Sequence, residues 1–266
     1  MPRFYLPPGQ SGGETLLLDG REAHHALQVL RLRPGEGVTI LDGRGARLEC
    51  EIAACGRDHL RLRVNERHWE PAPAAPLTLL QGIPKGKTFE FIIQKAAELG
   101  ASRVVPLLTD RVALRLGEED DGARKRDKWE AVAVEAIKQC GSCWLPEILA
   151  PQRPADYLAR GPRAELSLLA SLQAGSAHPR LTFTEFRAAH GRPPQSVDVW
   201  VGPEGDFTPE EITAILAGGA RPITLGNRVL RAETAACYCL SVLGYELAAP
   251  SAGSALETAP PSAAGG

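Results

Sequence analysis

The chain has 266 residues, a formal net charge of −2, 44% hydrophobic residues and six cysteines. This length allows one large or two modest domains, and the apolar fraction is sufficient for a buried core. The charge argues against a broadly basic nucleic-acid binder, so any positive surface must be local. The chain has no apolar run of about 18 residues and does not begin like a signal peptide, so we expect a cytoplasmic protein with reduced cysteines and no membrane partner.

Residues 1–70 have the pattern of a small β domain. Strand-like runs cover residues 15–18, 37–41, 47–53 and 59–64, and the sequence D-G-R-G at residues 42–45 is typical of a hairpin turn. One short helix is expected over residues 22–30. Ten arginines balance ten acidic residues, so the region is formally neutral. A compact β-barrel fits these pieces.

The remainder of the chain has the pattern of an α/β domain. The Pro/Ala-rich residues 71–76 are expected to be a semi-rigid linker, and residues 77–248 the second domain. A strand over residues 77–80, a helix over 88–99 and a strand over 104–108 predict a βαβ unit and a parallel sheet. Residues 117–126 should be exposed, 128–139 helical and 165–170 a strand. Residues 249–266 are predicted to be a disordered tail.

The turn over residues 82–88 nearly matches a phosphate-binding P-loop. Gly86, Lys87 and Thr88 follow a strand and open a helix, as that motif requires. Gln81 stands where the first glycine belongs, and Pro84 has no N–H to donate to a phosphate. Nucleotide hydrolysis is therefore a weak alternative function.

No metal site is predicted. His24 and His25 are adjacent, so they point to different faces of a helix, and no third ligand lies near them. Cys140 and Cys143 form a single C-x-x-C pair, whereas a zinc site needs four ligands.

Two strand–turn–helix units follow one another near the C-terminal end. In the first, a strand over residues 197–201 leads through G-P-E-G-D-F to a helix with Thr208 as N-cap, Pro209 at its first position and Glu211 completing a capping box. In the second, a buried strand over residues 222–225 leads through a turn with Gly226 to a mostly apolar helix from residue 233. Open α/β sheets bind ligands at such turns, so we expect a ligand site here.

At these residues the chain resembles a known family. The motifs V-G-P-E-G-D-F-T-P-E-E-I and L-G-N-R-V-L-R-A-E-T-A resemble the paired signature of SPOUT methyltransferases of the RsmE type. The stretches R-F-Y and H-A-L-Q-V-L-R-L-R-P-G-E resemble the PUA-like RNA-binding domain of that branch. The resemblance implies an α/β fold in which a PUA-like β-barrel precedes a domain with a deep trefoil knot. It also implies a homodimer that uses S-adenosyl-L-methionine to methylate N3 of a uridine in the 16S ribosomal RNA of the small subunit.

The resemblance places a cofactor site in the loops after three strands. The candidate contacts are Leu169, Ala170, Val201, Gly202, Glu204, Gly205, Ile223, Leu225, Gly226, Val229 and Leu230. Glycines let the backbone come close to a ligand, and the aliphatic side chains offer apolar contact to adenine.

Three residues of the second turn are the catalytic candidates. Arg228 and Arg231 can hold the uridine phosphate or a base carbonyl, although arginine cannot act as the base. Glu233 can accept a proton, orient Arg231 or cap the helix, and we favour orientation or capping.

Arg3, Arg31 and Arg33 are the RNA-binding candidates of the β domain, because arginine forms bidentate contacts with phosphate. By charge alone, an ordinary mixed-charge surface explains them as well. Near Cys140 the family usually shows a serine and then an arginine, so an RNA contact made there is in doubt for this chain. A non-catalytic RNA-binding protein, whose C-terminal turns are only structural, is the third class of function left open.

Overall fold

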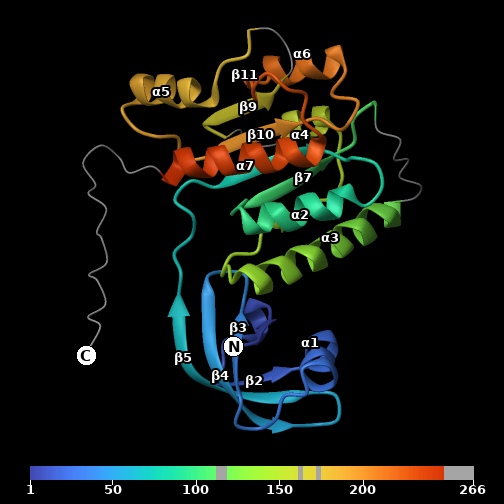
Figure 1. Cartoon of the computed structure of the whole chain (residues 1–266), viewed down its shortest axis with the longest axis vertical. Helices are drawn as coiled ribbons and strands as arrows, with labels where there is room; N and C mark the ends of the chain where they lie inside the picture. The colour runs from blue at the N-terminus through green and yellow to red at the C-terminus, as the bar shows by residue number, and fades with distance from the viewer. Residues whose placement is uncertain (112–118, 161–163, 172–174, 249–266) are drawn as a thin grey trace.

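The computed structural model describes residues 1–111, 119–160, 164–171 and 175–248. These residues form an N-terminal β part and a C-terminal α/β part, which lie one above the other along the long axis of the molecule (Figure 1). Each part has its own hydrophobic core. The tail predicted over residues 249–266 lies outside the described residues.

The N-terminal part is built on a five-stranded sheet. Its elements are β1 (Arg3–Tyr5), a 3-10 turn (Pro8–Gln10), β2 (Thr15–Leu18), α1 (Gly20–His24), β3 (Gly37–Leu41), β4 (Ala46–Cys55) and β5 (Leu60–Trp69). The strand order is β1-β3-β4-β5-β2, and all pairs are antiparallel except β1 with β3. Because side chains alternate across a strand, Leu48, Ile52 and Leu62 all face the core. No pairing of described residues joins β1 to β2, so the predicted barrel is an open half-barrel.

The hairpin between β3 and β4 has the predicted turn. Asp42 Oδ1 accepts hydrogen bonds from the backbone N–H groups of Arg44 (2.7 Å) and Ala46 (2.9 Å). Gly43 and Gly45 have φ angles of 72° and 108°, which glycine adopts without strain. The sequence D-G-R-G therefore determines this turn locally.

The helix predicted over residues 22–30 is not one regular helix. It begins as α1 and continues as a π-helical turn, η2 (His25–Val29). Arg31 then has a φ of 55°, which is uncommon for a residue other than glycine. Val29, Leu30 and Arg31 are exposed as a result.

The C-terminal part is a six-stranded, fully parallel sheet with helices on both faces. Its elements are β6 (Leu77–Gly82), α2 (Thr88–Glu98), β7 (Arg103–Leu107), α3 (Glu119–Cys140), β8 (Glu147–Ile148), α4 (Pro154–Arg160), β9 (Leu166–Ala170), α5 (Pro179–His190), β10 (Val197–Val201), α6 (Pro209–Ala217), β11 (Arg221–Ile223) and α7 (Ala232–Ala248). The strand order is β11-β9-β10-β6-β7-β8. The parallel sheet expected from the βαβ unit is confirmed.

Alternate residues of each strand enter two different cores. Leu79, Val199 and Ile223 pack with α2, α3, α5 and α7 on one face of the sheet. Leu80 and Trp200 pack with α4 and α6 on the other face. A parallel sheet covered on both faces needs apolar residues on both, which explains the nearly continuous apolar sequence of β6 and β10.

Several elements differ from the sequence prediction. Helix α3 begins at Glu119, so part of the charged segment 117–126 is helical, and residues 112–118 are not described. Helices α4 and α5 were not predicted, although α5 has Pro179 at its start and Gly191 with a φ of 70° at its end. The predicted buried strand over residues 222–225 is β11, a three-residue edge strand in which only Ile223 is buried.

The two parts are joined through α3. Arg3 Nη1 donates hydrogen bonds to the carbonyl oxygens of Lys138 (3.2 Å) and Gln139 (3.0 Å) at the C-terminal end of that helix. Lys138 Nζ pairs with Glu22 Oε1 at 2.7 Å, and its side chain is only 9% exposed. Backbone hydrogen bonds also run between residues 43–45 and residues 143–145. The C-terminal end of a helix carries a partial negative charge that favours nearby cations, so Arg3 stabilises the contact between the two parts.

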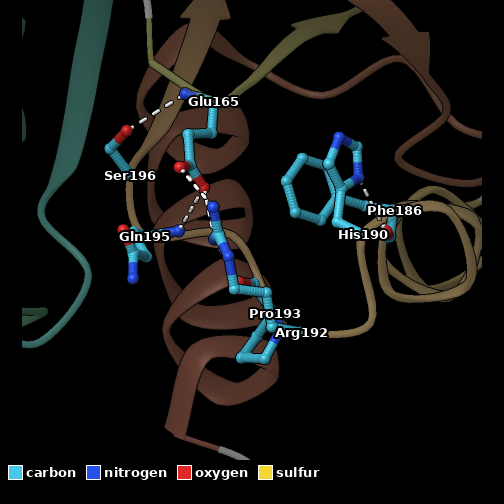
Figure 2. A network of polar contacts seen from close by, with 7 residues as sticks. All are labelled: Glu165, Phe186, His190, Arg192, Pro193, Gln195 and Ser196. Atoms are coloured by element: carbon cyan, nitrogen blue, oxygen red, sulfur yellow. Dashed lines mark hydrogen bonds and ion pairs between the residues drawn. The ribbon is translucent and has the colours of Figure 1, made fainter.

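A polar network ties the segment between α5 and β10 to Glu165, the residue before β9 (Figure 2). Both carboxylate oxygens of Glu165 accept hydrogen bonds from Arg192 at 2.8 Å, and one also accepts from the backbone N–H of Gln195. These donors lower the pKa of Glu165 to about 2. The network lies at the amino ends of β9 and β10, whereas the pocket described next lies at their carboxyl ends.

Candidate active site

A pocket lies at the carboxyl ends of β9, β10 and β11, where open α/β sheets usually bind ligands. Its volume is about 300 Å³. It is lined by Ala170, Ser171, Val201, Gly202, Pro203, Glu204, Asp206, Leu225, Gly226, Arg228, Val229, Leu230, Arg231, Ala232 and Ala235. The two turns singled out in the sequence therefore form one site, together with the loop that follows β9.

The turn after β10 is closely packed. A Cβ on Gly202 would lie 2.6 Å from Asp206 Oδ1, so this position requires glycine. Asp206 has a φ of 58°, and its Oδ1 accepts a hydrogen bond from the backbone N–H of Phe207 at 2.8 Å. The predicted capping box of α6 is confirmed: Thr208 and Glu211 each accept a hydrogen bond from the backbone N–H of the other. These contacts fix the turn in place.

The turn after β11 is more open. Gly226 has a φ of 105°, and a Cβ added there would meet no protein atom within 4 Å. Its backbone N–H donates to Thr224 Oγ1 at 3.2 Å, and Thr224 Oγ1 donates to the carbonyl of Gly226. Glycine is therefore required here by its backbone conformation and leaves free space beside the pocket.

The near P-loop packs against the turn after β10. Gln81 is fully buried, and its Nε2 donates hydrogen bonds to the carbonyl oxygens of Gly82 (2.9 Å) and Gly202 (3.2 Å). A Cβ on Gly82 would lie 2.4 Å from Pro203 Cδ. The backbone N–H of Lys85 donates to Glu204 Oε1 at 3.0 Å. The Glu204 carboxylate thus accepts a hydrogen bond from a backbone N–H that, in a P-loop, would donate to a phosphate.

Most of the predicted cofactor contacts line the pocket, and three do not. Leu169 and Ile223 are buried in the two cores on either side of the sheet, because successive side chains of a strand face opposite ways. Gly205 lines a different cleft, on the other side of the same turn. Five further lining residues were not predicted: Ser171, Pro203, Asp206, Ala232 and Ala235. All except Ala235 directly adjoin a predicted residue in the chain.

Two of the three catalytic candidates line the pocket and the third does not. Arg228 and Arg231 line the pocket and are exposed, so their side chains are available to a large substrate. Glu233 lies in the first turn of α7, outside the pocket lining. In the described part of the chain, no hydrogen bond or ion pair joins Glu233 to Arg231, so a role of Glu233 in orienting Arg231 or in capping the helix stays a prediction.

The three RNA-binding candidates of the β part lie on two segments, β1 and the turn after η2. Arg3 is engaged at the end of α3, which was not foreseen, and only its remaining nitrogen atoms can serve a phosphate. Arg31 and Arg33 are close to each other on an exposed segment, and the backbone N–H of Arg33 donates to Glu36. An RNA contact at these positions stays a prediction.

The buried titratable groups lie away from the pocket. Asp198, near the start of β10, accepts a hydrogen bond from Tyr157 Oη at 2.9 Å. Burial raises the pKa of Asp198, and burial together with this carboxylate raises the pKa of Tyr157. Among the residues the structure describes, no group of His, Cys, Asp or Glu could hold a metal ion, and no helix is long and apolar enough to cross a membrane.

Two family models match the chain. One, described as an RNA methyltransferase domain, covers residues 70–244, and the other, described as an RNA methyltransferase PUA domain, covers residues 18–65. Ribosomal RNA small subunit methyltransferase E of Synechocystis sp. is 34% identical over 243 residues, which are 90% of this chain and 76% of that protein. The protein of the same name from Mycobacterium bovis is 32% identical over 250 residues, which are 91% of this chain and 90% of that protein.

Solved structures agree with this similarity. A methyltransferase from Legionella pneumophila in complex with the bound cofactor SAM superposes with a TM-score of 0.80 at 30% identity, covering 91% of this chain and 96% of that one. The ribosomal RNA small subunit methyltransferase E of Neisseria gonorrhoeae, bound to S-adenosyl methionine, gives a TM-score of 0.78 at 27% identity over the same shares of the two chains.

Proposed function

The chain belongs to the RNA methyltransferase family that includes the ribosomal RNA small subunit methyltransferases E, and from this premise we propose that it methylates N3 of a uridine in 16S ribosomal RNA. The methyl donor is S-adenosyl-L-methionine. The observation that carries the proposal is the single pocket formed by both signature turns at the carboxyl ends of β9, β10 and β11.

The residues of the pocket suit this cofactor. Gly226 leaves the backbone open to a ligand, and Ala170, Val201 and Leu225 give the pocket apolar walls. The lining carboxylates of Glu204 and Asp206 complement a ligand that carries a sulfonium and an ammonium group. When bound, the cofactor supplies the methyl group.

The arginines of the second turn act on the RNA. The N3–H of uridine is a weak acid, so the site must stabilise the anion that forms as the proton leaves. Arg228 and Arg231 are exposed at the pocket and can donate hydrogen bonds to a base carbonyl or to the phosphate. They thereby hold the base in line for transfer. Neither can take the proton, because arginine stays charged.

The alternative functions have less support. In the near P-loop, the Lys85 N–H donates to the carboxylate of Glu204 from the turn after β10, and Gly82 packs on Pro203, so the turn does not form a phosphate cradle. A non-catalytic RNA-binding protein would not need an open, glycine-lined pocket beside two exposed arginines.

A homodimer accounts for the surface of α7. Helix α7 lies across the sheet beside α2 (Figure 1). Its outward stripe carries Tyr238, 39% exposed, and Tyr245, 76% exposed, and Phe91 on α2 is 44% exposed. Aromatic residues are enriched in protein interfaces, so a second copy of the chain is the occupant we expect on this face. The family assignment also supports a trefoil knot within residues 77–248, a linker over 71–76, the small ribosomal subunit as substrate and a cytoplasmic location.

Two measurements test the proposal. Calorimetry should detect S-adenosylmethionine binding to the purified protein. Mass mapping of nucleosides in ribosomal RNA from a strain that lacks the gene should show one 3-methyluridine lost, and restored with the wild-type gene. A protein that binds no cofactor, or a deletion strain with every modified uridine intact, would refute the assignment.

A further inference from the structure

A second cleft adjoins the cofactor pocket. It has a volume of about 570 Å³ and is lined by Ile83, Pro84, Lys85, Gly86, Phe89, Glu90, Arg111, Lys125, Lys128, Trp129, Pro203, Glu204 and Gly205. Pro203 and Glu204 line both cavities, so the turn after β10 is the wall between them. The remaining walls come from the turn before α2 and from one side of α3.

The second cleft carries more positive than negative groups. Among the described residues, four cationic side chains line it, against the carboxylates of Glu90 and Glu204. Both carboxylates are engaged: Glu90 pairs with Lys128 Nζ at 2.5 Å, and Glu204 accepts the backbone N–H of Lys85 at 3.0 Å. No carboxylate of a described residue pairs with the Lys85 ammonium, which is exposed. In a chain of net charge −2, such a local excess favours an anionic ligand.

The rest of the second cleft has an apolar wall and a second cation. Phe89 and Trp129, which are 2% and 6% exposed, form an edge-to-face pair with ring centroids 4.5 Å apart, and together with Pro84 they form the buried apolar wall of the cleft. Arg111 Nη1 donates a hydrogen bond to the carbonyl oxygen of Gly205 at 2.7 Å. This contact holds the Arg111 guanidinium at the rim of the cleft, and its other N–H groups can still donate to a ligand. No side chain caps the N-terminus of α2, whose partial positive charge adds to that of the lysines.

We infer that the second cleft binds a nucleotide of the RNA strand next to the target uridine, with Lys85 and Lys128 on its phosphate. This inference rests on the proposed function, because an RNA strand whose target base is at the cofactor pocket must continue past its rim. Phosphate contacts of this kind fix the register of the strand. Glu204 is a positioning residue: it ties the backbone of Lys85 to the wall of the cofactor pocket, so the RNA contact and the cofactor contact share one turn.

Equilibrium binding to unmodified small ribosomal subunits at several salt concentrations tests the inference. The variants are Lys85→Ala and Lys85→Ala with Lys128→Ala. Arg180→Ala is the matched control, because Arg180 is an exposed cation on α5 with no side-chain partner among the described residues. The double variant should bind RNA roughly 10- to 100-fold more weakly, and its salt dependence should flatten by about 0.7 for each lost phosphate contact. Its Kd for S-adenosylmethionine should match the wild type, and its melting temperature should fall only slightly, because Lys128→Ala removes a partly exposed ion pair with Glu90. All values for Arg180→Ala should match the wild type.

A folded double variant with the wild-type RNA affinity and salt dependence would overturn the inference. So would a free nucleoside triphosphate that binds through Lys85 while RNA binding does not depend on it, since the second cleft would then be a mononucleotide site. The binding measurement needs no turnover. A wild-type protein that methylates no uridine would therefore refute the proposed function. The effect of the lysine variants on RNA binding would still show whether the second cleft binds RNA.

Discussion

Replacing Gly226 with valine should abolish S-adenosylmethionine binding while the protein stays folded. Gly226 lines the pocket, has a φ of 105°, and a Cβ added there would meet no protein atom within 4 Å. The new side chain therefore enters space that the ligand uses and does not collide with the protein itself.

Gly219 offers a matched control for this change. It has a φ of 97°, a Cβ there would also meet nothing within 4 Å, and it lies outside the pocket lining. A branched residue at such a φ costs about 1–3 kcal/mol, so Gly219→Val and Gly226→Val should lower the free energy of unfolding by similar amounts. Only Gly226→Val also displaces the ligand. The valine side chain would take part of a pocket of only about 300 Å³, so we expect the Kd to rise at least about 100-fold, which corresponds to about 2.8 kcal/mol.

Calorimetry gives the Kd for the cofactor, and urea denaturation gives the free energy of unfolding. We expect the two variants to be alike in the second measurement and to differ in the first. A folded Gly226→Val protein with the wild-type Kd would show that the cofactor does not use this turn. Equal loss of binding in Gly219→Val would show that backbone strain, and not the site, controls affinity.

Three further predictions concern catalysis, assembly and pH. Arg231→Ala should slow single-turnover methylation of small subunits by about 10²- to 10³-fold with the Kd for S-adenosylmethionine within about twofold of wild type, and an unchanged rate would contradict its role. Tyr245→Glu should convert the proposed dimer to a monomer in light scattering, whereas Leu181→Glu, at another exposed apolar position, on α5, should not; a wild-type mass for both would place the interface elsewhere. Glu165→Gln should lower the free energy of unfolding at neutral pH. Because Arg192 lowers the pKa of Glu165 from 4.5 to about 2, the difference from wild type should shrink as the pH falls through that range, and a difference independent of pH would contradict the ion-pair account.

The features that the sequence determined by itself are those set by neighbours in the chain. The strand Val197–Val201 and the capping box of Thr208 and Glu211 were predicted at the observed residues, because strand alternation and capping depend on spacings of a few residues. The same holds for the hairpin turn at Asp42 and for the two glycine turns that carry the family signature. Strands β2 to β5 also lie close to the predicted ranges, whereas β1 and the open edge of the half-barrel were not predicted.

The tertiary structure alone decided which residues meet across long separations. Leu169 and Ile223 belong to predicted site strands, yet they face the cores, because the direction of a strand side chain depends on its sheet neighbours. The sequence suggested that Arg3 binds phosphate. In the structure its guanidinium instead donates a hydrogen bond to the carbonyl oxygen of Lys138 at the end of α3, 135 residues away in the chain. Gln81 interrupts a P-loop in the sequence, and only the packing of β6 against β10 shows why: its amide bonds the carbonyl of Gly202 and holds two distant turns together. Local sequence specifies the turns, whereas the contacts among them depend on the strand order of the sheet, which places β9, β10 and β11 side by side.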